Sequence, residues 1–151
     1  MASKVPISCS MIVESKPSAV AGLCEPILGT LVGSGFSKED IFAVHLALEE
    51  AFINAVKHGN KMDPRKKVTV DYSVHLDKVE ISMTDQGKGF NPDDVPDPRV
   101  GQNLYKPEGR GLLLMNSYMD VVKFNERGNR VYMVRYKEKP DMARSQGQTQ
   151  N

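Results

Sequence analysis

The spacing of apolar residues switches between helical and strand periods along the chain, and it predicts the order of the elements. Apolar residues recur at helical spacing after Ser15 or Ser18, either of which could cap a helix that ends at 33–35. A second helical pattern follows Ser37, with an acid three residues on as in a capping box, and stops near Gly59.

Strict alternation of apolar and polar residues predicts the strands. It covers 68–74 and 79–85, with a short turn between them, and 7–13 is predicted as the first strand. Two further strands, 121–125 and 131–137, form a predicted hairpin about Gly128-Asn129.

Between these strand pairs lie a loop and a helix. Residues 91–108 contain four prolines, and this composition predicts a loop too long to serve only as a connector. The apolar run 112–119 predicts a short helix.

The order of elements favours an α+β fold: a two-layer α/β sandwich with a mostly antiparallel sheet covered by helices on one face. A doubly wound parallel sheet is disfavoured because the two hairpins leave too few crossover helices. One domain is predicted over 1–138, and the polar residues 139–151 are predicted to form a disordered tail.

Composition excludes several classes of protein. A net charge of +1 provides no electrostatic footprint for nucleic acid or for a membrane surface. No apolar run is long enough to cross a bilayer, and the N-terminus lacks the apolar core of a signal peptide. Two cysteines cannot build a disulfide framework and lack metal-ligand spacing, so Cys24 is interpreted as a buried apolar residue and the chain as cytoplasmic.

Glu50 and Asn54 form the first candidate site. Four residues apart in a helix, they lie on one face, one turn from each other. An amide oxygen suits a Mg²⁺ ion that takes its other ligands from phosphate and water, and a carboxylate can accept a proton from an attacking hydroxyl. Alternatives remain: the pair could be part of a solvated helix face, and Glu49 could be the acid, although its partner four residues on is Ile53.

Asp85 forms the second candidate site. It continues the buried alternation of its strand, where a carboxylate is costly unless paired, and the exocyclic amine of a purine would pair with it. Gly87 and Gly89 would let the backbone approach the base closely. The alternative is an ordinary Asp turn at the end of a strand.

The third candidate site consists of Gly109, Arg110 and Gly111. They open an apolar helix, whose free N–H groups and dipole favour phosphate, and Lys106 lies close by in sequence. A P-loop is excluded because the Gly-Lys-Ser/Thr sequence is absent, and no parallel βαβ unit supports a Rossmann fingerprint. A glycine-rich helix start without a ligand is the other interpretation.

Taken in order, these segments resemble a known family. Residues 50–59, 85–90 and 109–115 are similar to the N, G1 and G2 boxes of the GHKL ATPase superfamily. The short length and residues 118–122 resemble, within it, the bacterial anti-sigma factor serine kinases of the RsbW and SpoIIAB type.

The resemblance implies an ATP and Mg²⁺ site under a mobile lid, with Glu50 as catalytic base and Asn54 as metal ligand. The nucleotide contacts that it implies are Asn54, Lys57, Asp85, Gly87, Gly89, Lys106, Gly109, Arg110, Gly111 and Leu112. Family members phosphorylate a serine of a small anti-anti-sigma protein, bind a sigma factor and are commonly homodimers. An arginine in the first helix docks the partner in that family, whereas no Lys or Arg occurs here between Lys16 and Lys38.

Two functions are therefore weighed. The first is a serine/threonine-protein kinase that acts as an anti-sigma regulator. The alternative is a non-catalytic, ATP-dependent protein-binding switch of the same fold. The ATPase domain of a sensor histidine kinase is disfavoured because no dimerising helical pair or phosphoacceptor segment is present upstream.

Overall fold

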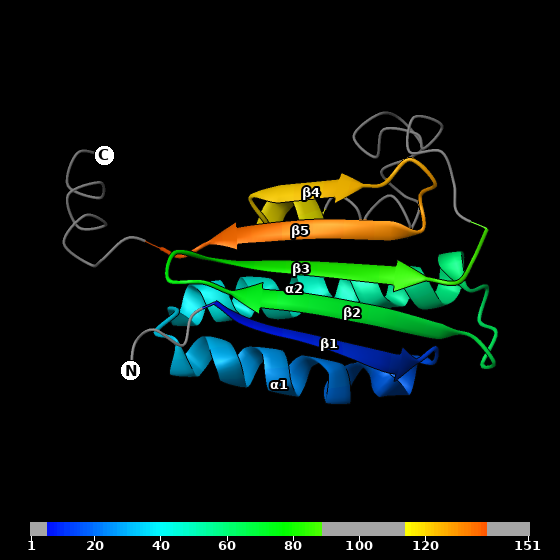
Figure 1. The fold of residues 1–151 in the computed structure, drawn as a ribbon, viewed down its shortest axis with the longest axis horizontal. Helices are drawn as coiled ribbons and strands as arrows, with labels where there is room; N and C mark the ends of the chain where they lie inside the picture. Colours follow the sequence, from blue (N-terminus) through cyan, green and yellow to red (C-terminus); the bar gives the residue numbers. More distant parts are fainter. Residues whose placement is uncertain (1–5, 89–113, 139–151) are drawn as a thin grey trace.

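The computed structural model describes residues 6–88 and 114–138, and the structural statements below concern these residues. The elements in chain order are β1 (Ile7–Glu14), a 3₁₀ turn η2 (Pro17–Ala19), α1 (Val20–Gly33), α2 (Lys38–Asn54), a π-helical turn η3 (Ala55–Gly59), β2 (Lys67–Val74), β3 (Lys78–Asp85), a helical segment at 114–118, β4 (Val121–Phe124) and β5 (Arg130–Tyr136). Figure 1 shows these elements in the sheet view.

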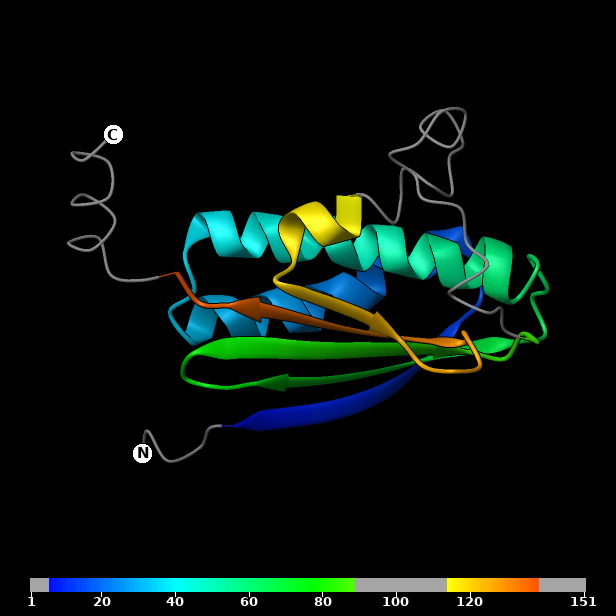
Figure 2. The same cartoon turned by 90° about the horizontal axis from the view of Figure 1, so that it is seen from above.

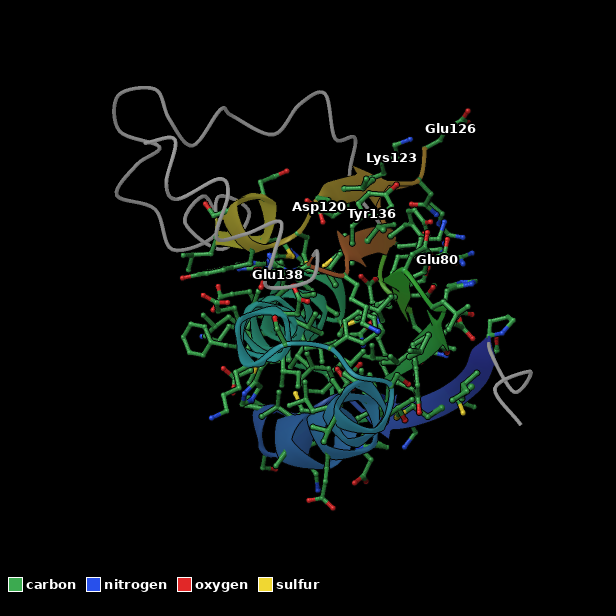
Figure 3. The ribbon with its side chains drawn as sticks, turned by 90° about the vertical axis from the view of Figure 1, so that its left-hand side faces the viewer. Glu80, Asp120, Lys123, Glu126, Tyr136 and Glu138 are labelled. Carbon is green, nitrogen blue, oxygen red and sulfur yellow. The ribbon has the colours of Figure 1, made fainter. Side chains whose placement is uncertain are left out.

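The five strands form one antiparallel sheet in the order β1-β2-β3-β5-β4. All three helices cover the same face of the sheet, with α1 behind β1, α2 behind the centre and the helix at 114–118 toward β4 (Figures 1 and 2). The view along the helix axes shows two layers (Figure 3). The predicted α+β sandwich is confirmed. None of the helices that the structure describes is long and apolar enough to cross a membrane.

The alternation in the strands produces the core. In β2 every second residue is buried, and these side chains face the helices: Val68, Val70, Tyr72 and Val74. The register aligns them with the buried residues of β3, such as Val70 with Met83. Because burial of apolar surface drives folding, a period of two in sequence becomes one apolar face of the sheet.

The predicted helix caps have different outcomes. Ser37 caps α2, since its Oγ accepts a hydrogen bond from the Asp40 N–H at 3.0 Å. The predicted cap of the first helix by Ser15 or Ser18 is wrong. The turn at Pro17–Ala19 leads into α1 with no side-chain cap, and the Ser15 hydroxyl is buried and accepts a hydrogen bond from Asn60 instead.

A buried ion pair joins α2, β5 and the helix at 114–118. Asp40 is 0% exposed, and its two oxygens accept hydrogen bonds from Arg135 Nε and from the Glu138 N–H, both at 2.9 Å. Arg135 Nη1 also donates to the Tyr118 carbonyl at 2.7 Å. This one guanidinium therefore holds the end of the short helix against the start of α2.

We expect Asp40→Ala to be strongly destabilising, by roughly 3–5 kcal/mol, because it leaves the Arg135 charge without its buried partner. Denaturant unfolding followed by circular dichroism measures this change. Lys16→Ala is the control, since the Lys16–Glu14 pair is exposed and should contribute little. Equal transition midpoints for Asp40→Ala and the wild type would contradict the expectation.

Candidate functional site

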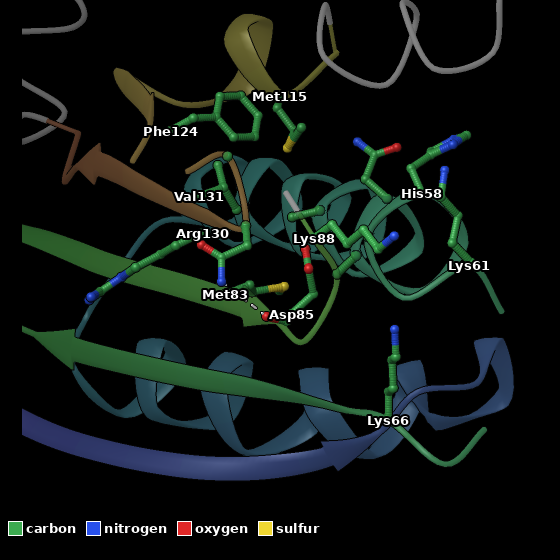
Figure 4. A pocket seen from close by; sticks show the side chains of 16 residues that line it. His58, Lys61, Lys66, Met83, Asp85, Lys88, Met115, Phe124, Arg130 and Val131 are labelled. Carbon is green, nitrogen blue, oxygen red and sulfur yellow. Dashed lines mark hydrogen bonds between the residues drawn. The ribbon is translucent and has the colours of Figure 1, made fainter. Parts of the chain in front are cut away.

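A cavity of about 500 Å³ opens between the end of α2, the ends of β3 and β5, and the helix at 114–118 (Figure 4). Its walls are largely apolar, formed by Ala51, Met83, Met115, Phe124 and Val131. These side chains come from five different elements, so the cavity exists only in the folded chain. Its size and lining suit a flat, apolar ring system.

The charge around the cavity is mostly positive. Of the described residues that line it, the basic side chains are Lys61, Lys66, Lys88 and Arg130, and the acidic one is Asp85. His58, Asn54 and Asn129 complete the polar side chains of the wall. A cavity with apolar walls and a basic rim can accommodate an anionic ligand with an apolar end.

Asp85 lies at the buried end of β3, as the alternation predicts, and it is 9% exposed. Its Oδ1 accepts a hydrogen bond from the Gly87 N–H at 2.8 Å, which is the turn considered above as an alternative interpretation. No donor among the described residues reaches Oδ2, and the side chain is directed into the cavity (Figure 4). Burial raises the pKa of this carboxyl, against smaller opposing effects of the Gly87 N–H, Lys66 and Arg127. The turn and a ligand contact are therefore compatible, because each uses a different oxygen.

Gly59 and Gly87 hold Asp85 in place by having no side chain. A Cβ atom at Gly59 would overlap the Asp85 carboxylate, and a Cβ atom at Gly87 would overlap the Gly59 carbonyl oxygen. The sequence predicts that Gly87 lets the ligand approach the backbone closely. In the structure its steric reason is a close approach of two backbone segments, the end of η3 and the turn after β3.

Asn60 is a site residue that the sequence argument missed. It is fully buried, and its Nδ2 donates to Ser15 Oγ at 2.9 Å and to the Lys67 carbonyl at 3.0 Å. Its Oδ1 accepts from the Gln86 N–H at 2.8 Å. One amide thus joins the ends of β1, β2 and β3 directly beside Asp85. An Asn that follows a helix-terminating glycine was the available signal.

The loop after Asn60 carries backbone strain at the cavity rim. Lys61 and Met62 have φ values of 55° and 61°, in the left-handed region that non-glycine residues rarely adopt. Lys61 lines the cavity, so the strained backbone directs a lysine to the site. Strain of this kind is common at functional sites.

The structure separates the roles of Glu49 and Glu50. The Glu49 carboxylate lies 3.3 Å from His45 Nε2. Burial raises the pKa of Cys24, on α1, to about 11, and the negative charge of Glu49 adds to this effect. Glu49 is therefore paired along α2 with His45 and lies within electrostatic range of α1. Glu50 is half-buried one turn before Asn54, on the cavity side of α2 but outside the residues that line the cavity.

The other predicted site residues are distributed unevenly. Lys57 is exposed and is not among the described lining residues, whereas the next residue, His58, does line the cavity. Six predicted residues lie outside the described part of the chain: Gly89, Lys106, Gly109, Arg110, Gly111 and Leu112. The predicted lid lies there as well.

Comparison with known proteins identifies similar chains. Residues 13–135 match the model of the histidine kinase-like ATPase domain. The chain is 35% identical over 118 residues to a serine-protein kinase RsbW of Bacillus licheniformis, and the aligned residues cover 72% of each chain. It is 31% identical over 129 residues to the enzyme of the same name from Listeria innocua, which covers 81% of this chain and 82% of the relative.

A solved structure shares the fold. The structure of the RsbU and RsbW domains of a Mycobacterium tuberculosis protein superposes with a TM-score of 0.60 at 15% identity, over 88% of this chain and 33% of the other. At this identity the likeness concerns the fold alone.

Proposed function

This chain belongs to the histidine kinase-like ATPase domain family, and from this premise we propose how its cavity serves phosphoryl transfer. The chain is an ATP-dependent serine-protein kinase of the RsbW type and an anti-sigma factor. Its substrate is the serine of a small anti-anti-sigma protein. The observation that carries this assignment is Asp85 Oδ2, which no donor among the described residues reaches, in the wall of a largely apolar cavity with a basic rim.

The apolar end of the cavity receives adenine. Asp85 Oδ2 accepts a hydrogen bond from the exocyclic amine, while Met83, Met115 and Val131 contact the ring. Guanine presents a carbonyl oxygen at the position of that amine, so it would face the carboxylate with an acceptor instead of a donor. The base is thereby selected by one buried contact.

Asn54 fits the role of magnesium ligand. Its amide lies on the cavity wall, and the described residues contain no group of three or more His, Cys, Asp or Glu that could hold an ion alone. Mg²⁺ commonly takes one protein oxygen and completes its shell with phosphate and water. When bound, the ion would neutralise charge on the phosphates, and Lys61 and Lys66 are placed to add to this effect.

Glu50 acts as the base. Its position one turn from Asn54 and outside the cavity wall supports a role toward a serine that arrives from solvent and not toward the nucleotide itself. Glu50 takes the hydroxyl proton as the serine oxygen attacks the γ-phosphorus and the bond from phosphorus to the ADP oxygen breaks.

The chain functions in the cytoplasm, as a homodimer that also binds a sigma factor. The direct test is transfer of labelled γ-phosphate from ATP to the purified anti-anti-sigma protein. A chain that binds ATP but transfers nothing would favour the non-catalytic switch.

We expect nucleotide binding to depend on Mg²⁺, because Asn54 can hold the ion only together with phosphate oxygens. Calorimetric titration of ATP should give a weaker affinity in chelator than in Mg²⁺, and Asn54→Ala should reduce that difference. Adenosine, which lacks phosphates, is the control and should bind equally in both buffers. Identical ATP affinities with and without the ion would remove Asn54 from this role.

We expect Asp85→Asn to weaken adenine nucleotides and to reduce the preference for ATP over GTP, because the amide presents a donor where the adenine amine needs an acceptor. Competition between ATP and GTP measures this preference. Equal binding of the two nucleotides by the wild type would contradict the Asp85 contact.

The same substitution has a predicted effect on the nucleotide-free chain. Because burial raises the pKa of Asp85, its contribution to stability is full below the ordinary carboxyl value and is lost as pH rises through the raised value. Asp85→Asn should therefore unfold at a higher denaturant concentration than the wild type at neutral pH, and the difference should shrink in acid.

A further inference from the structure

Large apolar side chains lie among charged ones on the outward face of α2, where Glu49 is one turn from both Leu46 and Ile53. The Phe42 side chain is 59% exposed, and Leu46 and Ile53 follow on the same outward side, both half-buried. The inner face of α2 already supplies the core with residues such as Val44 and Leu48. Large apolar side chains gathered on the outward face as well indicate a surface that another molecule covers.

A second helix extends this outward face. Tyr118 packs edge to face against Phe42, with ring centroids 6.3 Å apart and planes at 89°. Leu114, one turn before Tyr118, is 40% exposed. We call Phe42, Leu46, Ile53, Leu114 and Tyr118 together the Phe42 surface.

The Phe42 surface is held rigidly. The Tyr118 carbonyl accepts the 2.7 Å hydrogen bond from Arg135, which is itself bound to the buried Asp40 two residues before Phe42. The helix at 114–118 lies alongside α2 in both views of the helical layer (Figures 2 and 3). A pre-organised aromatic pair loses little conformational entropy on binding and is typical of the residues that dominate interfaces.

The Phe42 surface adjoins the proposed catalytic base. Leu46 is one turn before Glu50, and Phe42 is two turns before it, a rise of about 12 Å along the helix. A standard protein interface covers about 800 Å² on each partner, which corresponds to a disc of about 16 Å radius. A protein whose serine reaches Glu50 from the solvent side would therefore cover Leu46 and Phe42 as well.

We propose that the Phe42 surface is the docking site for the protein substrate, the serine-bearing anti-anti-sigma protein, which contacts it with an apolar patch of its own. The proposal rests on the proposed kinase function, because continuity with Glu50 selects this occupant. The His45–Glu49 pair adds a polar contact to the same outward face. The chain's own residues 139–151 are a poor alternative occupant, since Met142 is their one large apolar side chain.

The test is Phe42→Lys in the full chain, with Leu76→Lys as the matched control, because Leu76 is a 69% exposed apolar residue in the turn between β2 and β3. We expect Phe42→Lys to raise KM for the anti-anti-sigma protein about ten- to a hundredfold, as loss of an aromatic anchor does. The KM for ATP and kcat at saturating substrate should stay within about twofold of wild type, since uniform binding is lost and the chemical step is not. Phe42→Leu should restore most of the affinity, and Leu76→Lys should match wild type.

An unchanged KM for the protein substrate in Phe42→Lys would overturn the proposal while leaving the kinase function intact. If the wild type transfers no phosphate, the kinase function fails instead, and calorimetric titration of the same protein into both chains still decides the docking question. Loss of self-association in Phe42→Lys, measured by sedimentation equilibrium, with unchanged substrate affinity would assign the surface to a second copy of the chain and overturn the proposal.

Discussion

Gly59→Ala should abolish most of the affinity for ATP although it adds a single methyl group. The new Cβ would occupy the space of the Asp85 carboxylate, so the carboxylate must leave its position in the cavity wall. A hydrogen bond to a charged group contributes about 1.5–3 kcal/mol, so we expect ATP to bind about ten- to a hundredfold more weakly. Calorimetry with ATP and with ADP measures the loss, which should be similar for both because it acts on the base.

A helical glycine without such a neighbour is the control. Nothing lies within 4 Å of a Cβ atom built on Gly29 in α1, so Gly29→Ala should stabilise the chain by about 0.5–1 kcal/mol and leave ATP affinity unchanged. Adding Asp85→Ala to Gly59→Ala makes room for the methyl group. The double variant should regain stability without regaining affinity, and recovery of both would contradict the assigned contact.

Glu50→Ala should stop phosphoryl transfer and leave ATP binding nearly intact. A base acts on the attacking serine hydroxyl, and Glu50 lies outside the cavity wall, so its loss affects the transition state and not the bound nucleotide. General-base catalysis typically contributes on the order of a hundred- to ten-thousandfold in rate. The measurement is transfer of labelled γ-phosphate to the anti-anti-sigma protein, with ATP affinity determined in parallel.

Glu49→Ala is the matched control, one residue away on the same helix. Because Glu49 pairs with His45 and has Ile53 instead of Asn54 four residues on, its removal should leave kcat at saturating protein substrate unchanged. Retained transfer in Glu50→Ala together with loss in Glu49→Ala would assign the base to Glu49. Loss of ATP binding in Glu50→Ala would instead make it a nucleotide contact.

Much of the fold was predictable because each element is set by local spacing. The alternation through β2 and β3, the Ser37 cap and the hairpin turn at Gly128, whose φ is 79°, all depend on residues close in sequence. The failed cap at Ser15 has the opposite cause. Its hydroxyl is engaged by Asn60, 45 residues away, and no local pattern reports that contact.

By itself the sequence determined which residues of β2 are buried, where α2 begins, and that Asp85 stands on a buried face close to two glycines. Only the tertiary structure decided that Gly59 limits the space around Asp85, that Asn60 joins three strand ends, and that Arg135 meets Asp40. The physical reason is the sequence separation of the residues that make these contacts. Periodicity assigns a side chain to a face within its own element, whereas these contacts join atoms that meet only after the strand order β3-β5-β4 and the packing of α2 have been set.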